Sequence, residues 1–126
     1  MCSSDLALAR NVGIMVRTPL ARGLLSGKFR VGQEIPAELR WRRPQGDALQ
    51  SRLARVEQLR FLERPGQTMA QAALRWVLEH PAVHCVIPGA RTVEQLESNI
   101  DATNGALTRE ESERIRALQQ EWRVRA

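Results

Sequence analysis

Residues 83–99 constrain the fold more than any other stretch of the chain. The run from Val83 to Ile87 is short, apolar and rich in β-branched side chains, which is typical of a buried strand. Pro88-Gly89 ends the run in a turn, and Thr92 then opens a helix as its N-cap, with Gln95 three residues later to complete a capping box. A strand that passes through a tight turn into a helix predicts a βα unit.

The predicted helix after Thr92 has two faces. Its apolar stripe recurs at helical spacing and consists of Val93, Leu96 and Ile100. Its polar face carries Arg91, Gln95, Ser98 and Asn99. An ordinary solvated surface explains such a polar face as well as a binding site does. The unpaired N–H groups of a helix start attract anions, however, and Gly89 and Arg91 lie beside that start, which favours a site for a phosphate with an attached base.

A second strand is predicted from Val12 to Val16, a continuous apolar run of the kind that parallel strands show when both faces are buried. Residues 5–10 read as the end of a preceding helix. Residues 17–28 follow the strand as a loop with one proline and two glycines, and by composition alone this loop is an ordinary exposed connection. The order of helix, strand, loop and helix favours parallel βα units.

These residues carry a resemblance to a known family. Val86-Ile-Pro-Gly-Ala-Arg91, followed by Gln95 and Asn99, closely resembles the cofactor-binding signature near the C-terminus of aldo-keto reductases. The stretch from Pro19 to Lys28 is similar to the loop after the seventh barrel strand of bacterial members, and residues 70–77 resemble their penultimate barrel helix. The resemblance implies that residues 1–126 are the C-terminal portion of one (β/α)8 TIM-barrel domain, with about two parallel strands, flanking helices and a terminal helix.

The resemblance also implies NADP(H) as cofactor. Gly89, Ala90 and Arg91 would hold the adenosine 2′-phosphate. The adenine end would be lined by Gln95, Ser98 and Asn99. Many relatives carry Lys-Ser in place of Gly89-Ala90, so the phosphate contacts here would fall to Arg91 and backbone amides, and the preference for NADPH over NADH is left open.

In the family, the loop after the seventh strand folds over the cofactor pyrophosphate. By position, the contacts would come from Thr18, Leu20 and Arg22. Arg17 stands where many relatives place an aromatic residue against the nicotinamide ring, and its planar guanidinium can stack there as well.

The family's catalytic tetrad of Asp, Tyr, Lys and His has no counterpart in this chain. The chain has no tyrosine, and its single lysine, Lys28, falls in the predicted cofactor loop. The resemblance implies hydride transfer between NADPH and an aldehyde or ketone, with this chain supplying nucleotide binding and no catalytic residue; a carbonyl substrate would need the missing N-terminal half. Two alternatives remain open. One is a non-catalytic nucleotide-binding partner subunit, since some relatives of this fold attach to membrane channels, and the other is a truncated fragment without activity.

Residues 29–50 are predicted to be an irregular loop that contains prolines, a glycine and many arginines. In a barrel, such a loop would face the substrate side. Trp41 would either contact a substrate or anchor the loop. The densest basic cluster, Arg40 to Arg43, lacks a recognised nucleic-acid motif, and we therefore expect no nucleic-acid partner.

Further helices are predicted over residues 49–63, after the capping box of Thr68 and Gln71, and after that of Thr108 and Glu111. The helix after Thr68 should place Trp76 in the core, and its Ala70, Ala73, Leu74 and Val77 should pack on the sheet.

His80 and His84 have a spacing that suits zinc only on a single helix. Pro81 interrupts that helix, so we expect no metal site. The sequence instead predicts a helix-end cap for His80 and a buried, hydrogen-bonded imidazole for His84. Cys85 is predicted to be a small buried side chain in the strand.

The composition, 43% hydrophobic and 26% charged, fits one soluble domain. No apolar run approaches the length of a membrane span, and the first residues do not resemble a signal peptide. We therefore expect a cytoplasmic protein without a membrane partner. The net charge of +5 suits an anionic ligand such as a dinucleotide.

Overall fold

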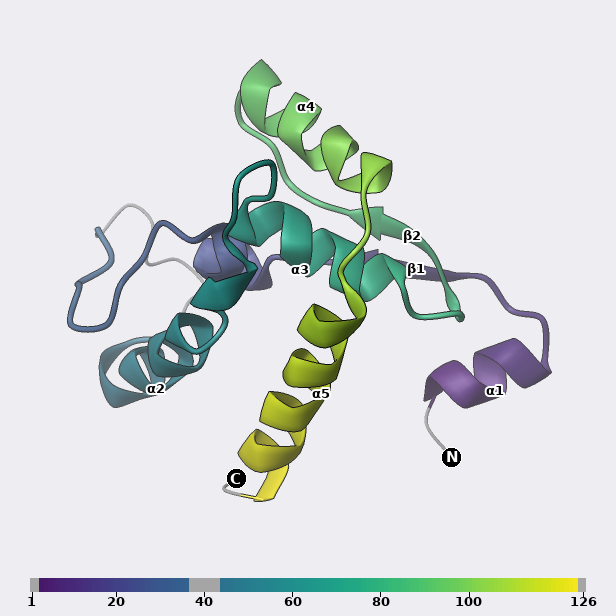
Figure 1. The fold of residues 1–126 in the computed structure, drawn as a ribbon, viewed down its shortest axis with the longest axis horizontal. Coiled ribbons are helices and arrows are strands. Elements are labelled where there is room, and N and C mark those ends of the chain that lie inside the picture. The colour runs from purple at the N-terminus through teal and green to yellow at the C-terminus, as the bar shows by residue number, and fades with distance from the viewer. Residues whose placement is uncertain (1–2, 37–43, 125–126) are drawn as a thin grey trace.

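The computed structural model describes residues 3–36 and 44–124. The elements follow one another in this order (Figure 1): helix α1 (Ser3–Ala9), strand β1 (Ile14–Arg17), 3₁₀ helix η1 (Ala21–Ser26), helix α2 (Gly46–Glu57), 3₁₀ helix η3 (Arg60–Leu62), helix α3 (Met69–Leu78), strand β2 (Val83–Ile87), helix α4 (Val93–Asp101), 3₁₀ helix η4 (Ala102–Asn104) and helix α5 (Arg109–Val124). The predictions for Trp41 and for the basic cluster Arg40 to Arg43 fall outside the described residues.

The two predicted strands form a parallel pair. Ile14 pairs with Val83 and Met15 with Cys85, so His84 is the extra residue of a bulge in β2. The Nδ1 atom of His84 accepts a hydrogen bond from the backbone N–H of Ile14 at 3.3 Å. The side chain thus supplies an acceptor at the place where the backbone pairing slips.

The predicted burial of the strands is wrong in part. His84 and Cys85 are exposed, and the Met15 and Ile87 residues are 70% and 53% exposed. Helix α3 packs on β2, but among the described residues no second layer covers the other side of the sheet. A continuous apolar run indicates a strand that suits burial on both faces, and here only one face is covered.

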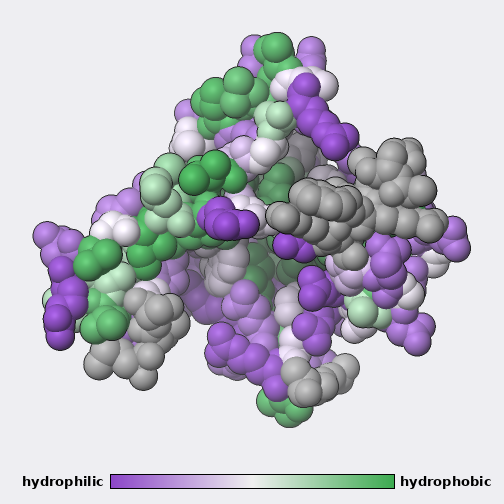
Figure 2. Space-filling model, turned by 180° about the vertical axis from the view of Figure 1, so that it is seen from behind, coloured by the Kyte–Doolittle hydropathy of each residue, from purple (hydrophilic) through white to green (hydrophobic). Residues whose placement is uncertain are grey.

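The apolar stripe of α4 is also exposed. Val93, Leu96 and Ile100 are 66%, 52% and 57% exposed. Figure 2 shows the resulting hydrophobic surface over α4, at the top of the view, and toward α1, at its left edge. Surfaces of this kind usually mark contacts with another element or molecule.

The buried apolar side chains form two clusters. One lies under η1 and α2 and consists of Leu24, Phe29, Ile35, Leu49 and Leu53. The other joins α3 to α5 and consists of Leu62, Met69, Ala72, Leu107 and Ile115, with Trp76 packed against it. Trp76 is therefore at the edge of a core, half-buried. Leu74 is buried on α3 as predicted, but the other buried apolar positions of this helix are Met69 and Ala72 rather than the predicted Ala70, Ala73 and Val77.

A buried polar network connects α3 to the start of α5. Arg75 donates to the Gln67 side-chain oxygen at 2.6 Å, and Gln67 donates to a carboxylate oxygen of Glu111 at 3.2 Å. Glu111 also completes the predicted capping box of α5, because it accepts from the Thr108 N–H at 2.8 Å while the Thr108 hydroxyl accepts from the Glu111 N–H at 3.1 Å. This network fixes α5 against α3.

The predicted bounds of β1 and α2 need correction. Strand β1 is Ile14–Arg17 rather than Val12–Val16. Helix α2 begins at Gly46, so it takes the last five residues of the predicted 29–50 loop, and it ends at Glu57 rather than near residue 63. The chain then turns through η3.

Within residues 3–36 and 44–124, every helix is too short or too polar to cross a lipid bilayer.

Candidate functional site

The two segments with family-like motifs lie on one cleft of about 660 Å³. Residues that follow β1 form one wall, namely Thr18, Pro19, Leu20, Arg22, Gly23, Ser26, Lys28 and Phe29. Residues from the end of β2 into α4 form the opposite wall, namely Ile87, Gly89, Ala90, Arg91, Gln95 and Ser98. Thr68 and Ala70 of α3 line it as well. We call this space the loop–helix cleft. It lies at the carboxyl ends of the parallel strands, where α/β proteins bind their ligands.

The wall after β1 is a tightly wound segment rather than an open loop. Thr18, Ala21 and Arg22 have positive φ angles of 59°, 49° and 57°. The Ala21 N–H donates to Thr18 O at 3.0 Å, and the Ser26 hydroxyl donates to Gly23 O at 2.6 Å. A positive φ is costly for a β-branched residue such as Thr18, and strain of this kind is typical of binding sites. The 3₁₀ helix η1 within residues 17–28 was not predicted from the sequence.

The opposite wall is organised by the first turn of α4. Thr92 is its N-cap, as predicted, because the Thr92 hydroxyl accepts from the Gln95 N–H at 3.2 Å. The reciprocal bond differs from a capping box: the Gln95 side-chain oxygen accepts from the Arg91 N–H at 2.8 Å. Asn99 donates to Gly89 O at 3.5 Å. Gln95 and Asn99 therefore brace the turn that carries Arg91.

The electrostatics of the cleft favour an anion. Of the described residues that line it, Arg22, Lys28 and Arg91 are cationic and none is acidic. The pKa of Glu94, in the first turn of α4, is lowered because its own backbone N–H and the Thr92 hydroxyl stabilise the charged carboxylate. The start of α4 thus stabilises negative charge, as expected for an exposed helix N-terminus.

The cleft gathers most of the residues that the sequence predicted. Arg17 and Asn99 are the two predicted residues that do not line it. Arg17 ends β1, pairs with Ile87 and is exposed, and Asn99 acts through Gly89. Lys28 and Thr68 also line the cleft and were not predicted to do so. Lys28 belongs to the loop motif that resembles the family. The capping box of Thr68 predicted a helix start, but it did not indicate what that start would face.

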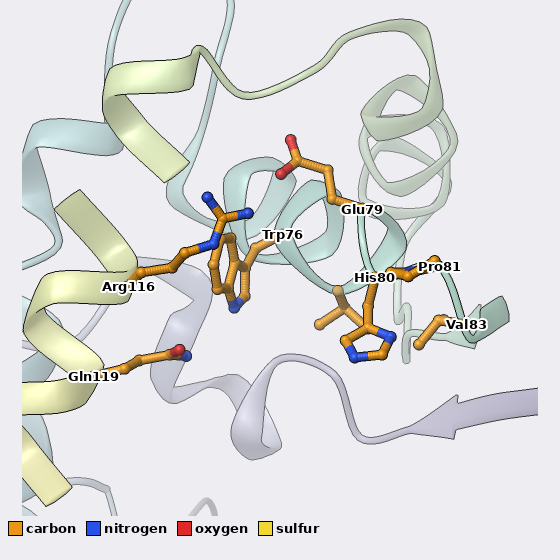
Figure 3. A pocket seen from close by; sticks show the side chains of 8 residues that line it. Trp76, Glu79, His80, Pro81, Val83, Arg116 and Gln119 are labelled. Carbon is orange, nitrogen blue, oxygen red and sulfur yellow. The ribbon is translucent and has the colours of Figure 1, made fainter. Parts of the chain in front are cut away.

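A second cleft of about 440 Å³ lies between the end of α3 and α5 (Figure 3). The Arg116 guanidinium lies 5.5 Å from the centre of the Trp76 ring at this cleft. The lining includes none of the predicted site residues. His80 does not point toward a metal cluster, since the described residues contain no group of three or more His, Cys, Asp and Glu side chains that could hold an ion. Its Nδ1 instead accepts from the Ala82 N–H at 3.2 Å.

Comparison with known proteins identifies the family. A family model described as the Aldo/keto reductase family matches residues 3–120. The chain belongs to the aldo/keto reductase family. Among relatives of this aldo/keto reductase chain, the L-glyceraldehyde 3-phosphate reductase of Escherichia coli (strain K12) is 40% identical over 103 residues, which cover 74% of the chain and 29% of the relative. An aldo-keto reductase of Strobilurus tenacellus is 33% identical over 125 residues, or 94% of the chain and 37% of the relative.

Solved structures agree with this assignment. The chain is similar to the glycerol dehydrogenase of Gluconobacter oxydans, with a TM-score of 0.73 and 29% identity over 90% of this chain and 36% of that one. It is also similar to an aldo-keto reductase of Bacillus halodurans in its holo form, with a TM-score of 0.64 and 28% identity over 91% and 36%. The predicted fold, the C-terminal portion of a (β/α)8 barrel, is confirmed. The chain spans about a third of the length of these relatives.

Proposed function

We propose that the loop–helix cleft binds NADPH and that the chain is the nucleotide-binding part of an aldo-keto reductase. The observation that carries the proposal is the meeting of two distant motifs, one after each parallel strand, around three cationic side chains. Membership of an oxidoreductase family supports a nicotinamide nucleotide as the ligand. Cytoplasmic location, where NADPH is available, belongs to the same proposal.

The residues at the start of α4 fit the 2′-phosphate end of the nucleotide. Arg91 offers a guanidinium, which binds phosphate oxygens in a bidentate manner. Its backbone is held by Gln95, so the side chain starts from a fixed point. The positive end of the α4 helix dipole adds an attraction for a phosphate at this helix start.

The wall after β1 fits the pyrophosphate. Arg22 and Lys28 provide positive charge on that wall, and Thr18, Leu20 and Gly23 of the tightly wound segment line the cleft beside them. Arg17 is the last residue of β1 and lies outside the cleft lining. Its proposed role is to stack on the nicotinamide ring. The adenine end would then lie along Gln95 and Ser98.

The bound nucleotide would supply the hydride for reduction of an aldehyde or ketone, and this chain would bind and orient it. The chain has no tyrosine to protonate the product oxygen. The described residues that line the cleft include no Asp, Glu or His side chain either. We therefore assign positioning to this chain and the proton transfer to groups outside it.

The test is titration of the full chain with NADPH and, separately, with NADH. The 2′-phosphate contact should make NADPH the tighter ligand, and Arg91→Ala should remove most of that preference, with a loss of about ten- to a hundredfold in NADPH affinity, as for a charge-assisted bond. Arg109→Ala is the matched control, because the Arg109 side chain is 91% exposed in an ion pair on α5. Equal NADPH affinity of Arg91→Ala and wild type would contradict the phosphate assignment.

A second candidate is a non-catalytic nucleotide-binding subunit. A probable voltage-gated potassium channel subunit beta of Arabidopsis thaliana is 32% identical over 100 residues, which cover 74% of this chain and 30% of that protein. The two candidates differ in two measurements: a subunit co-purifies with another protein and oxidises NADPH negligibly in the presence of aldehydes, whereas a reductase that includes the catalytic groups turns over.

A further inference from the structure

Helix α4 is held in place with little help from apolar burial. Across Val93–Asp101, all of which the structure describes, no residue is buried. The apolar stripe of the helix faces outward. Its position relative to α3, and therefore the shape of the loop–helix cleft, must depend strongly on polar contacts.

Two side chains of α3 provide such contacts. The Gln71 amide donates to Ser98 O at 3.2 Å, and the Arg75 guanidinium donates from Nε to Ala102 O at 3.1 Å. The two donors are four residues apart, and so are the two acceptors. One helical turn therefore separates the two donors on α3, and their acceptors lie near the end of α4 and at the start of η4. The bonds form successive cross-links between two segments that run in the same direction.

The carbonyl of Ser98 is well placed to receive this bond. Where α4 passes into η4, the Ala102 N–H donates to Asn99 O and Ile100 O. The N–H one turn beyond Ser98 is thus directed to other acceptors, and the Gln71 amide donates to Ser98 O from the side.

Gln71 also closes the start of α3. Its side-chain oxygen accepts from the Thr68 N–H at 3.0 Å, and the Thr68 hydroxyl accepts from the Gln71 N–H at 3.2 Å. Thr68 and Ser98 both line the loop–helix cleft, from different helices. A single amide group therefore connects the α3 wall of the cleft to the α4 wall.

We infer that Gln71 is a positioning residue for the nucleotide site: it fixes α4, and with it Arg91 and Gln95, against the α3 wall. The inference rests on the proposed function of the cleft. An amide is needed because one end must accept a hydrogen bond and the other must donate one. A carboxylate accepts at both ends, and an apolar side chain does neither.

The test uses Gln71→Glu in the full chain with NADP⁺ as the probe. This variant keeps an acceptor for the Thr68 N–H and replaces the donor to Ser98 O with a carboxylate oxygen. We expect NADP⁺ affinity to fall roughly five- to tenfold, as for one lost hydrogen bond with added repulsion, and amide hydrogen exchange across Val93–Asp101 to accelerate. Gln58→Ala is the control, because it removes a hydrogen bond that Gln58 accepts from the Trp122 ring N–H of α5 at 2.7 Å, and neither residue lines the cleft.

A pH series separates positioning from simple loss of stability. As pH falls toward the pKa of an ordinary glutamate, about 4.3, the variant carboxyl gains a proton that it can donate to Ser98 O. The ratio of wild-type to variant affinity should then approach one, whereas the Gln58→Ala ratio stays constant. If wild type binds NADP⁺ and Gln71→Glu shows unchanged affinity or unchanged exchange, the inference about Gln71 is overturned. The proposed function of the cleft is not affected by that result. Absence of NADP⁺ and NADPH binding by wild type would instead contradict the proposed function.

Discussion

The side-chain oxygen of Gln95 accepts a hydrogen bond from the backbone N–H of Arg91 at 2.8 Å. Gln95 was predicted to line the adenine end of a nucleotide. The structure adds that it holds the turn from which the Arg91 side chain projects. The proposed contact of Gln95 with the ligand and the position of Arg91 are therefore linked at the start of α4.

We predict that Gln95→Ala weakens NADPH binding about fivefold, the size of effect expected when one hydrogen bond is lost. The loss should be smaller for NADH, because the turn that loosens is the one proposed to hold the 2′-phosphate. Calorimetric titration with both nucleotides checks the prediction. Gln119→Ala, in the cleft of Figure 3, is the control and should bind both as wild type does. An equal loss for NADPH and NADH would assign Gln95 to adenine contact alone.

Gly89→Lys should strengthen NADPH binding. A Cβ atom at Gly89 would meet no heavy atom within 4 Å, so a longer side chain has space there. The added ammonium would reach the proposed 2′-phosphate position beside Arg91, and we expect a severalfold gain for NADPH with little change for NADH. The measurement is the ratio of the two dissociation constants. A gain of the same size for NADH would show that the lysine acts through general charge.

Gly105→Ala should destabilise the protein. A Cβ atom there would lie 2.6 Å from Cζ and 3.1 Å from Nε of Arg75, and Arg75 is held by Gln67 and Ala102 O, so it cannot move away freely. Overpacking of this kind costs about 1–3 kcal/mol. Urea unfolding measures the cost. Gly13→Ala, where a Cβ would meet nothing within 4 Å, is the matched control. Equal stability of the two variants would mean that Arg75 adapts to the added methyl group.

The Glu111 carboxylate should make stability depend on pH in the acid range. Burial alone would raise its pKa, but hydrogen bonds from Arg64 and the Thr108 backbone, with the Arg64 charge, together lower the pKa below the usual 4.5. A lowered folded-state pKa stabilises the protein above the unfolded pKa, and this stabilisation is lost as pH falls through the folded value.

Comparison of wild type with Glu111→Gln tests this dependence. Wild type should have the larger free energy of unfolding at pH 7, and the difference between the two proteins should shrink as pH falls below 4.5. Urea unfolding at pH 7, 5 and 3 provides the measurement. If the difference in free energy of unfolding stays constant over this range, Glu111 is not the source of the pH dependence.

The sequence predicts those features that depend on a few neighbouring residues. Strand β2 has the predicted bounds, Val83–Ile87. The capping boxes begun by Thr68 and Thr108 form as predicted, because each needs only a hydroxyl and a side chain three residues later. The signature around Arg91 also identified the family, which the comparisons confirm.

Burial could not be predicted in the same way. An apolar pattern shows which face of an element suits burial, but whether another element covers that face depends on the rest of the fold. Cys85 and the stripe of α4 are exposed for this reason. The composition of the cleft was beyond local patterns too, since Thr68 and Lys28 join it only through the parallel arrangement of the strands.

Amide hydrogen exchange of the full chain with and without saturating NADPH tests nucleotide binding in the loop–helix cleft most directly. We predict joint protection of residues 18–28 and 89–99, the two walls of the loop–helix cleft, with little change in α5. Protection confined to one wall would contradict a shared nucleotide site. Protection around Trp76 and Arg116 instead would place the nucleotide in the other cleft, and no protection anywhere would contradict nucleotide binding by this chain.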